Sequence, residues 1–295
     1  MRFNLIADEA IHTHSAEPLA SYYQLSPFVW RDIDSQLHLL LRAVNFSDRA
    51  SEKIARIYHG ISRDGIEFYM DMDPAIAAGP DDYDRDGCED PTVVRDRDRL
   101  YVYYTAWNQP ERRGALALAD GPDPGNLQKR GVVLASRPER LNPKEAEIVR
   151  AADGTWRLFF EFAHEDRSKI GSAASQRVDG SWHELEPPLC SRAELWDSWH
   201  LSTGPVVELA DTCVMFYNGA NRDAKWRIGY AVFDKTFARV IDRCSDFLIK
   251  PPRPKGDETD IAFAASAVRE GDLIRLYYSV ADQYMRRATI LPLTS

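Results

Sequence analysis

The chain has 295 residues, of which 44% are hydrophobic, enough for one large globular core or two small ones. Its 37 basic and 46 acidic residues give a net charge of −9 without a basic block, which disfavours nucleic acid as a partner because phosphate contacts need clustered Lys and Arg. No apolar run approaches the roughly 20 residues that cross a bilayer, and the first residues lack the apolar core of a secretion signal, so we expect a cytoplasmic protein with no membrane partner.

Short runs of aromatic and β-branched residues dominate the chain, and Asp-Gly turns separate them at 64–65, 153–154 and 179–180. No amphipathic helix longer than about three turns is expected. The four cysteines are scattered without the CxxC spacing of a zinc site, so neither a metal nor another cofactor is predicted. The expected class is all-β.

A repeat runs through these predicted strands. An apolar or aromatic pair recurs five times at nearly even intervals, and its copies begin at Leu40, Tyr103, Phe159, Phe216 and Tyr277. A second strand follows each of the first four pairs and keeps an almost constant interval, and the fifth copy is degenerate, ending near 287–289. A unit of this length fits a four-stranded propeller blade, and we predict a five-bladed β-propeller that spans 1–295 as one domain. The alternative is a β-sandwich with evenly spaced strands.

The repeat also predicts which residues lie around the propeller axis. One set directly follows each pair: Arg42, Thr105, Glu161, Asn218 and Ser279. A second set lies at one fixed distance before each of the last four pairs: Asp90, Ala146, Thr203 and Ala264. Pseudosymmetry should gather both sets around one funnel.

Four segments carry a resemblance to a known family: 37–43 (LHLLLRA), 62–68 (SRDGIEF), 87–91 (GCEDP) with 103–106 (YYTA), and 277–282 (YYSVAD). In this order and spacing the chain resembles glycoside hydrolase family 130, the mannoside phosphorylases and mannosidases. The resemblance implies a five-bladed propeller that cleaves β-mannosides with inversion. It implies that Asp90 is the catalytic acid and that Arg42 and Asp282 bind the sugar in the cleaved subsite.

The chain departs from the family pattern where phosphate would bind. Thr92 follows Pro91 where the family's phosphorylases carry arginine, Asn218 stands in place of histidine, and Glu161 in place of a basic residue. Lys144 is retained, and His200 takes a position that often holds lysine. Because phosphate recognition needs fixed cations and donors, these changes favour hydrolysis.

An inverting hydrolase needs a protonated acid and a carboxylate base about 6.5–9.5 Å apart. The sequence offers Glu161, Asp197 and Glu258 as bases, with Glu161 preferred because it follows an inner-strand pair. Other predicted pocket residues are Glu89, which could tune Asp90 by like-charge repulsion, Arg56, Asp64, Lys144 and His200. Sugar-stacking platforms are predicted at Trp107, Trp196 and Trp199.

The prediction from sequence is therefore an inverting glycosidase that acts on an oligosaccharide or glycoside, with Asp90 as acid and Glu161 or Asp197 as base. One alternative is a mannoside phosphorylase, which uses inorganic phosphate held by Arg42, Lys144, His200 and Arg56. Another is a non-catalytic glycan-binding propeller. Assembly into a homo-oligomer, the sugar and the linkage are left open.

Overall fold

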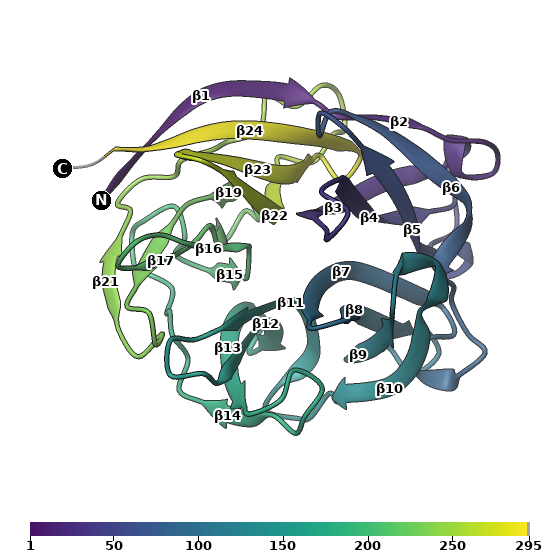
Figure 1. Cartoon of the computed structure of the whole chain (residues 1–295), viewed down its shortest axis with the longest axis horizontal. Helices are drawn as coiled ribbons and strands as arrows, with labels where there is room; N and C mark the ends of the chain where they lie inside the picture. The colour runs from purple at the N-terminus through teal and green to yellow at the C-terminus, as the bar shows by residue number, and fades with distance from the viewer. Residues whose placement is uncertain (294–295) are drawn as a thin grey trace.

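The computed structural model describes residues 1–293, and its strands form sheets arranged in a ring around a central axis (Figure 1). The strands are joined by loops and by four 3-10 turns of three residues each: η1 (Leu19–Ser21), η2 (Ala50–Glu52), η3 (Asp82–Asp84) and η4 (Pro124–Asn126). Within this range no helix is long and apolar enough to cross a bilayer. The all-β prediction is confirmed.

The first two blades follow each other along the chain. The first contains β3 (Tyr23–Arg31), β4 (Leu37–Val44), β5 (Ala55–Ser62) and β6 (Glu67–Ile76), and the short β2 (His12–His14) runs parallel to β6. The second contains β7 (Gly87–Asp96), β8 (Arg99–Asn108), β9 (Arg113–Gly121) and β10 (Gln128–Leu134). One parallel pairing, between Ala55 and Gly87, connects the two blades.

The third blade is regular and the fourth is broken. The third contains β11 (Leu141–Arg150), β12 (Trp156–His164), β13 (Arg167–Ser175) and β14 (His183–Leu185). The fourth is divided into two short sheets, one of β15 (His200–Ser202), β18 (Asn218–Ala220) and β19 (Trp226–Ile228), the other of β16 (Val206–Glu208), β17 (Cys213–Met215), β20 (Ala231–Phe233) and β21 (Val240–Arg243). Gly204 lies at the bend between β15 and β16, packed directly on the Phe216 carbonyl, where no side chain would fit.

The fifth blade joins the two ends of the chain. It contains β22 (Ala262–Glu270), β23 (Leu273–Val280) and β24 (Tyr284–Leu293), and its outer strand is β1 (Arg2–Ala10). β1 pairs antiparallel with β24 from Arg2 opposite Leu293 to Ala10 opposite Arg286, so the first and last strands of the described range lie side by side (Figure 1). The ring is therefore fastened by backbone hydrogen bonds between segments that are far apart in sequence.

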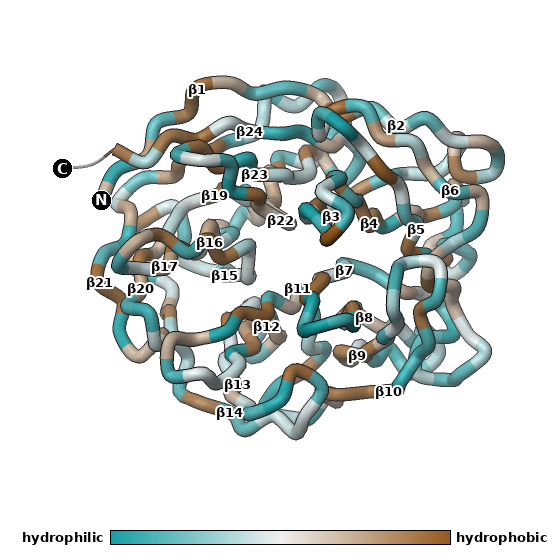
Figure 2. Tube along the Cα trace, in the orientation of Figure 1, coloured by the Kyte–Doolittle hydropathy of each residue, from teal (hydrophilic) through white to brown (hydrophobic). Residues whose placement is uncertain are grey.

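The hydrophobic core lies between neighbouring blades. Tyr103 of the second blade packs with Phe160 of the third, and Phe216 of the fourth packs with Tyr278 of the fifth. These residues belong to the predicted repeat of pairs, and all ten pair residues are buried. Figure 2 shows hydrophobic segments along the strands and hydrophilic ones along most connecting loops. Burial of one such large side chain stabilises a fold by about 1.5–3 kcal/mol. Each blade therefore has a large pair at this position, and the pairs make the repeat visible in the sequence.

A bulge recurs in the innermost strand of several blades. In β7 the register shifts between Glu89 and Thr92, in β11 between Lys144 and Glu147, in β3 between Leu25 and Phe28 and in β22 between Ala264 and Ser266. A bulge places one extra residue in the strand and redirects its side chain. Three bulge residues have left-handed backbone angles: Ser26 (φ 51°), Asp90 (φ 47°) and Glu145 (φ 50°).

Candidate active site

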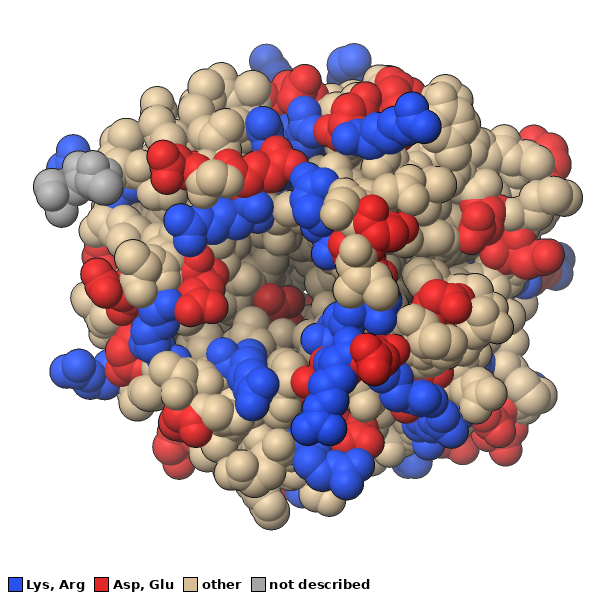
Figure 3. Space-filling model, in the orientation of Figure 1, with Lys and Arg blue, Asp and Glu red and all other residues tan. Residues whose placement is uncertain are grey.

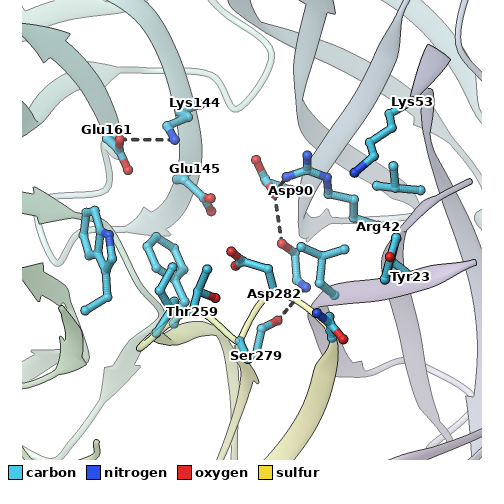
Figure 4. Close-up of a pocket in the computed structure, with 18 of the residues that line it drawn as sticks. Tyr23, Arg42, Lys53, Asp90, Lys144, Glu145, Glu161, Thr259, Ser279 and Asp282 are labelled. Atoms are coloured by element: carbon cyan, nitrogen blue, oxygen red, sulfur yellow. Dashed lines mark hydrogen bonds and ion pairs between the residues drawn. The ribbon is translucent and has the colours of Figure 1, made fainter. Parts of the chain in front are cut away.

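A pocket of about 490 Å³ opens at the propeller axis. Figure 3 shows the hollow at the centre of the molecule, with charged side chains around its rim. All the blades contribute to its lining, the second through Asp90, the fourth through Trp226 and the others through several residues each. The predicted funnel is thus present. Figure 4 shows its polar side chains pointing toward one another across the space.

Asp90 lies at the bulge of β7, and its carboxylate is buried. Its Oδ1 accepts a hydrogen bond from the Ser26 hydroxyl (2.9 Å) and lies 3.3 Å from Nη1 of Arg42. The other Arg42 nitrogen, Nη2, pairs with Glu89 at 3.0 Å. Burial works against the charge of Arg42, but Glu89 and Asp90 raise its pKa overall, so this cation persists and holds both carboxylates of the motif.

Glu89 lies beside the pocket rather than on its lining. Burial raises the pKa of Glu89, and the neighbouring Asp90 adds to the shift while Arg42 opposes it. The predicted proximity of the two acidic side chains is therefore present. In Glu89, desolvation and repulsion from the Asp90 carboxylate act in the same direction, because both favour the neutral carboxyl.

Lys144 and Glu161 face each other across β11 and β12 and form an ion pair at the pocket wall (Figure 4). Lys144 Nζ lies 3.3 Å from Glu161 Oε1, and Glu161 is only 2% exposed. The Glu161 carboxylate raises the pKa of Lys144 by more than burial lowers it, so the amine stays protonated. The second Glu161 oxygen, Oε2, is buried without a hydrogen-bond partner among residues 1–293. It is a free acceptor in a site that also contains an acid.

Glu145 is a pocket residue that sequence reasoning missed. Burial raises the pKa of Glu145 well above its ordinary value, and the nearby Asp90 carboxylate adds to the shift, so the pocket favours the neutral form of this carboxyl, which can donate a hydrogen bond. The fixed spacing read from the sequence selects Ala146, whereas the observed bulge register makes Glu145 the counterpart of Asp90. Allowing that spacing to vary by a single position would have found it.

Asp282 completes the acidic side of the pocket from the turn between β23 and β24. Its backbone is left-handed (φ 56°), and burial raises the pKa of its carboxyl. Ser279, beside it, accepts a hydrogen bond from the backbone N–H of Ser26 (2.8 Å), which ties the first blade to the fifth. Tyr23 and Lys53 lie across the pocket from Lys144 and Glu161 (Figure 4), and Lys53 has no ion-pair partner within residues 1–293.

His200 lies next to the pocket but does not line it. Its Nδ1 accepts a hydrogen bond from the Ser168 N–H (3.0 Å), and burial lowers its pKa, so the ring is neutral. The ring stacks on Trp226, with centroids 5.5 Å apart, and Trp226 lines the pocket. The aromatic residues of the lining are Trp226, Phe263 and Tyr23, whereas the three tryptophans predicted from sequence lie outside it.

The structure corrects the prediction for Asp197, which is fully buried away from the pocket. Its Oδ2 lies 2.8 Å from Arg192 Nη2 and 2.5 Å from Arg243 Nη2, and it accepts a hydrogen bond from the Tyr217 hydroxyl at 2.7 Å. A carboxylate enclosed by two guanidinium groups and a phenol has no room to activate water. Asp197 stabilises the fourth blade instead.

Three further predicted residues also lie outside the pocket lining. Arg56 donates to the backbone carbonyl of Ile54. Asp64 accepts hydrogen bonds from backbone N–H groups of its own turn, chiefly that of Glu67, which lower its pKa. Glu258 accepts from the Lys255 N–H in an exposed loop, although its neighbour Asp257 does reach the pocket. Within residues 1–293 no group of three or more His, Cys, Asp or Glu side chains is placed to hold a metal ion.

Comparison with known proteins decides the family. Residues 31–291 match the family model described as β-1,4-mannooligosaccharide phosphorylase. The chain belongs to glycoside hydrolase family 130. The resemblance read from the sequence is confirmed, and with it a glycoside-cleaving enzyme of a family whose members act on mannosides.

Two relatives of this family 130 protein are similar over most of its length. A 1,2-β-oligomannan phosphorylase of Thermoanaerobacter sp. (strain X514) is 24% identical over 262 residues, covering 83% of this chain and 82% of the relative. A β-1,2-mannobiose phosphorylase of Listeria innocua is 26% identical over 239 residues, covering 76% and 63%.

Solved structures share the fold. A β-1,2-mannobiose phosphorylase from Listeria innocua in complex with β-1,2-mannobiose has a TM-score of 0.79 at 20% identity, with 96% of each chain covered. Another, from work on family 130 glycoside hydrolases that target β-1,2-mannosidic linkages in Candida mannan, also has a TM-score of 0.79 at 20% identity, with 97% and 94% covered. These likenesses, together with the observed ring of sheets, confirm the five-bladed propeller.

Proposed function

We propose that this family 130 protein cleaves a β-mannosidic linkage with Asp90 as the proton donor and inorganic phosphate as the acceptor. The observation that carries the proposal is the convergence of Asp90, Arg42 and Lys144 on one pocket. The description of the family model and the names of the relatives, all of them phosphorylases, support phosphate as the acceptor.

The charge balance of the pocket is compatible with an anion. Arg42 and Lys144 stay charged, and Lys53 adds a third cation to the lining. Burial raises the pKa values of Glu145 and Asp282, which shifts both carboxyl groups toward the neutral form. Phosphate binds where fixed cations and hydrogen-bond donors meet, and Glu145 in the neutral form that burial favours would be one more donor.

Asp90 would supply the proton that the leaving oxygen needs. The Ser26 hydroxyl and the Arg42 guanidinium fix its carboxyl group, so little reorientation is required when substrate binds. Proton transfer by a positioned side chain contributes about 10²–10⁴-fold to a rate. The sugar in the cleaved subsite would lie against Arg42 and Asp282.

Hydrolysis is the second candidate, and two observations favour it. Glu161 presents a buried, unpartnered Oε2 in a pocket where a water molecule could donate to it. Two of the positions that depart from the family's phosphorylases are occupied structurally: Thr92 donates to the Ala146 carbonyl, and Asn218 donates to the carbonyls of Thr203 and Ala264. Neither side chain is free to hold phosphate.

Turnover of β-1,2- and β-1,4-linked mannobiose with and without inorganic phosphate decides between the two acceptors. Phosphorolysis predicts mannose 1-phosphate and a rate that depends on phosphate concentration. Mannose released at an undiminished rate without phosphate would rule phosphorolysis out and support hydrolysis. In that case Glu161→Gln should abolish the reaction, because the base is lost.

The role of Asp90 is tested by Asp90→Asn, which keeps the shape of the side chain but cannot donate the proton. We expect kcat to fall by about 10²–10⁴-fold while the melting temperature changes little. Asp179→Asn, at an exposed hairpin ion pair with Arg177, is the matched control and should retain wild-type kcat. Unchanged kcat in Asp90→Asn would remove Asp90 from the mechanism.

A further inference from the structure

A second hollow, of about 580 Å³, lies beside the first one. Trp199 lines it, and the next residue, His200, stacks on Trp226 of the central pocket. Arg167, the first residue of β13, also lines the second hollow. It pairs with His164 at the end of β12, the strand that carries Glu161. The two hollows are therefore neighbours on the same face of the third and fourth blades.

Two arginines enclose the Trp199 ring in this hollow. The guanidinium carbon of Arg167 lies 3.8 Å from the ring centroid and that of Arg222 lies 4.0 Å from it. Two guanidinium groups this close to one centroid fit only on opposite faces of the indole. Stacking fixes the plane of each group, so both are pre-organised for planar hydrogen bonding.

Neither arginine has a partner for its N–H groups. Within residues 1–293 no ion pair and no side-chain hydrogen bond is formed by Arg167 or Arg222, whereas the arginines of the central pocket and of the Asp197 cluster are all paired. Each guanidinium group carries five donors. Two fixed cations with free donors in a concave surface form a receptor for an anion.

The remaining walls suit a sugar. Asn221 and Ser198 offer amide and hydroxyl groups, and Glu194 and Asp223 offer carboxylates that can accept from sugar hydroxyls. Asp223 lies 3.8 Å from Lys225, which offsets its charge. Both faces of Trp199 are covered, so it cannot serve as the stacking platform expected from the sequence.

We propose that Arg167, Trp199 and Arg222 form a subsite for a saccharide unit that carries an anionic group, a carboxylate or a phosphate monoester. The inference rests on the proposed cleavage of a glycoside in the central pocket and adds the chemical class of its substrate. Guanidinium groups bind both of these anions through paired N–H donors, and a neutral sugar would leave those donors unused. The substrate would extend from the central pocket across the Trp226 wall into the second hollow.

Three disaccharides of one linkage test this subsite: a β-mannosyl unit joined to glucose, to glucuronate or to glucose 6-phosphate. We expect at least one anionic form to exceed the neutral form in kcat/KM by about tenfold or more, equivalent to about 1.4 kcal/mol. In an Arg167→Gln/Arg222→Gln double variant this ratio should fall to near one. The matched control is Arg112→Gln, which removes an exposed arginine from the corresponding hairpin of the second blade and should keep the wild-type ratio.

Calorimetric titration of the same three disaccharides into Asp90→Asn separates the two proposals. It measures binding without turnover, so anion recognition is tested even if the wild-type protein cleaves none of them. Tighter binding of glucuronate assigns a carboxylate, and tighter binding of the 6-phosphate assigns a phosphate monoester. Equal affinity for neutral and anionic forms, or a preference that persists without both arginines, would overturn the subsite.

Discussion

Replacing Asp197 by asparagine separates the structural and catalytic interpretations of a residue that the sequence offered as a general base. Asn keeps the shape of the side chain and removes its charge. Arg192 and Arg243 lie 2.8 and 2.5 Å from the fully buried Asp197 carboxylate and would then lose the counterion that they share. At an effective dielectric constant of about 20, two unit charges 4 Å apart interact by about 4 kcal/mol.

Two such attractions are lost in Asp197→Asn, and the lower desolvation cost of a neutral side chain offsets part of them. Breaking a buried ion pair by removing one partner costs about 3–5 kcal/mol. Because both arginines are partly exposed, at 23% and 12% of their side-chain surface, we expect a loss of about 3 kcal/mol, at the lower end of that range. For a chain of this size the melting temperature should fall by about 6 °C.

Thermal unfolding and kinetics, measured on the same preparation, decide whether Asp197 is a structural or a catalytic residue. Asp179→Asn, which breaks the exposed pair with Arg177, should cost less than about 1 kcal/mol. The folded fraction of Asp197→Asn should retain wild-type kcat, because Asp197 does not line the pocket. A melting temperature equal to that of the control, or a hundredfold loss of kcat in fully folded protein, would refute the structural assignment.

Other predictions concern buried residues of the third and fourth blades. Burial raises the pKa of Glu147 to about 8, so the folded state keeps a proton that the unfolded chain releases, and stability should fall as pH rises from about 4.5 to 8, by at most about 1.36 kcal/mol per pH unit. Glu147→Gln should flatten this dependence when melting is measured at pH 5 and pH 8, and an unchanged slope would exclude Glu147 as its source. A methyl group at Gly219 would lie 2.6 Å from Trp196 Cζ3 and 2.7 Å from Asp197 Cβ, so Gly219→Ala should cost about 1–3 kcal/mol in urea unfolding. Gly125→Ala, where the nearest atom is 3.4 Å away, is its control and should be close to neutral; equal effects of the two changes would contradict the packing.

The sequence by itself determined the propeller, because the same physical requirement recurs in each blade. An inner pair must be buried between neighbouring sheets, and this leaves a repeat of large apolar residues that can be counted. The same register placed Arg42, Glu161 and Ser279 at equivalent positions facing the axis. The motif at Asp90 then identified the pocket and the family.

Only the tertiary structure decided which charged residues share the pocket. Glu145 lines the pocket because it is itself a bulge residue with a left-handed backbone. A strand bulge changes the direction of a side chain and has no fixed sequence signal. Asp197 lies outside the pocket because it pairs with Arg192 and with Arg243, and Arg243 is distant in the chain. The raised pKa values of Glu145, Glu89 and Asp282 likewise depend on burial, which is a property of the assembled ring and cannot be read from any one segment.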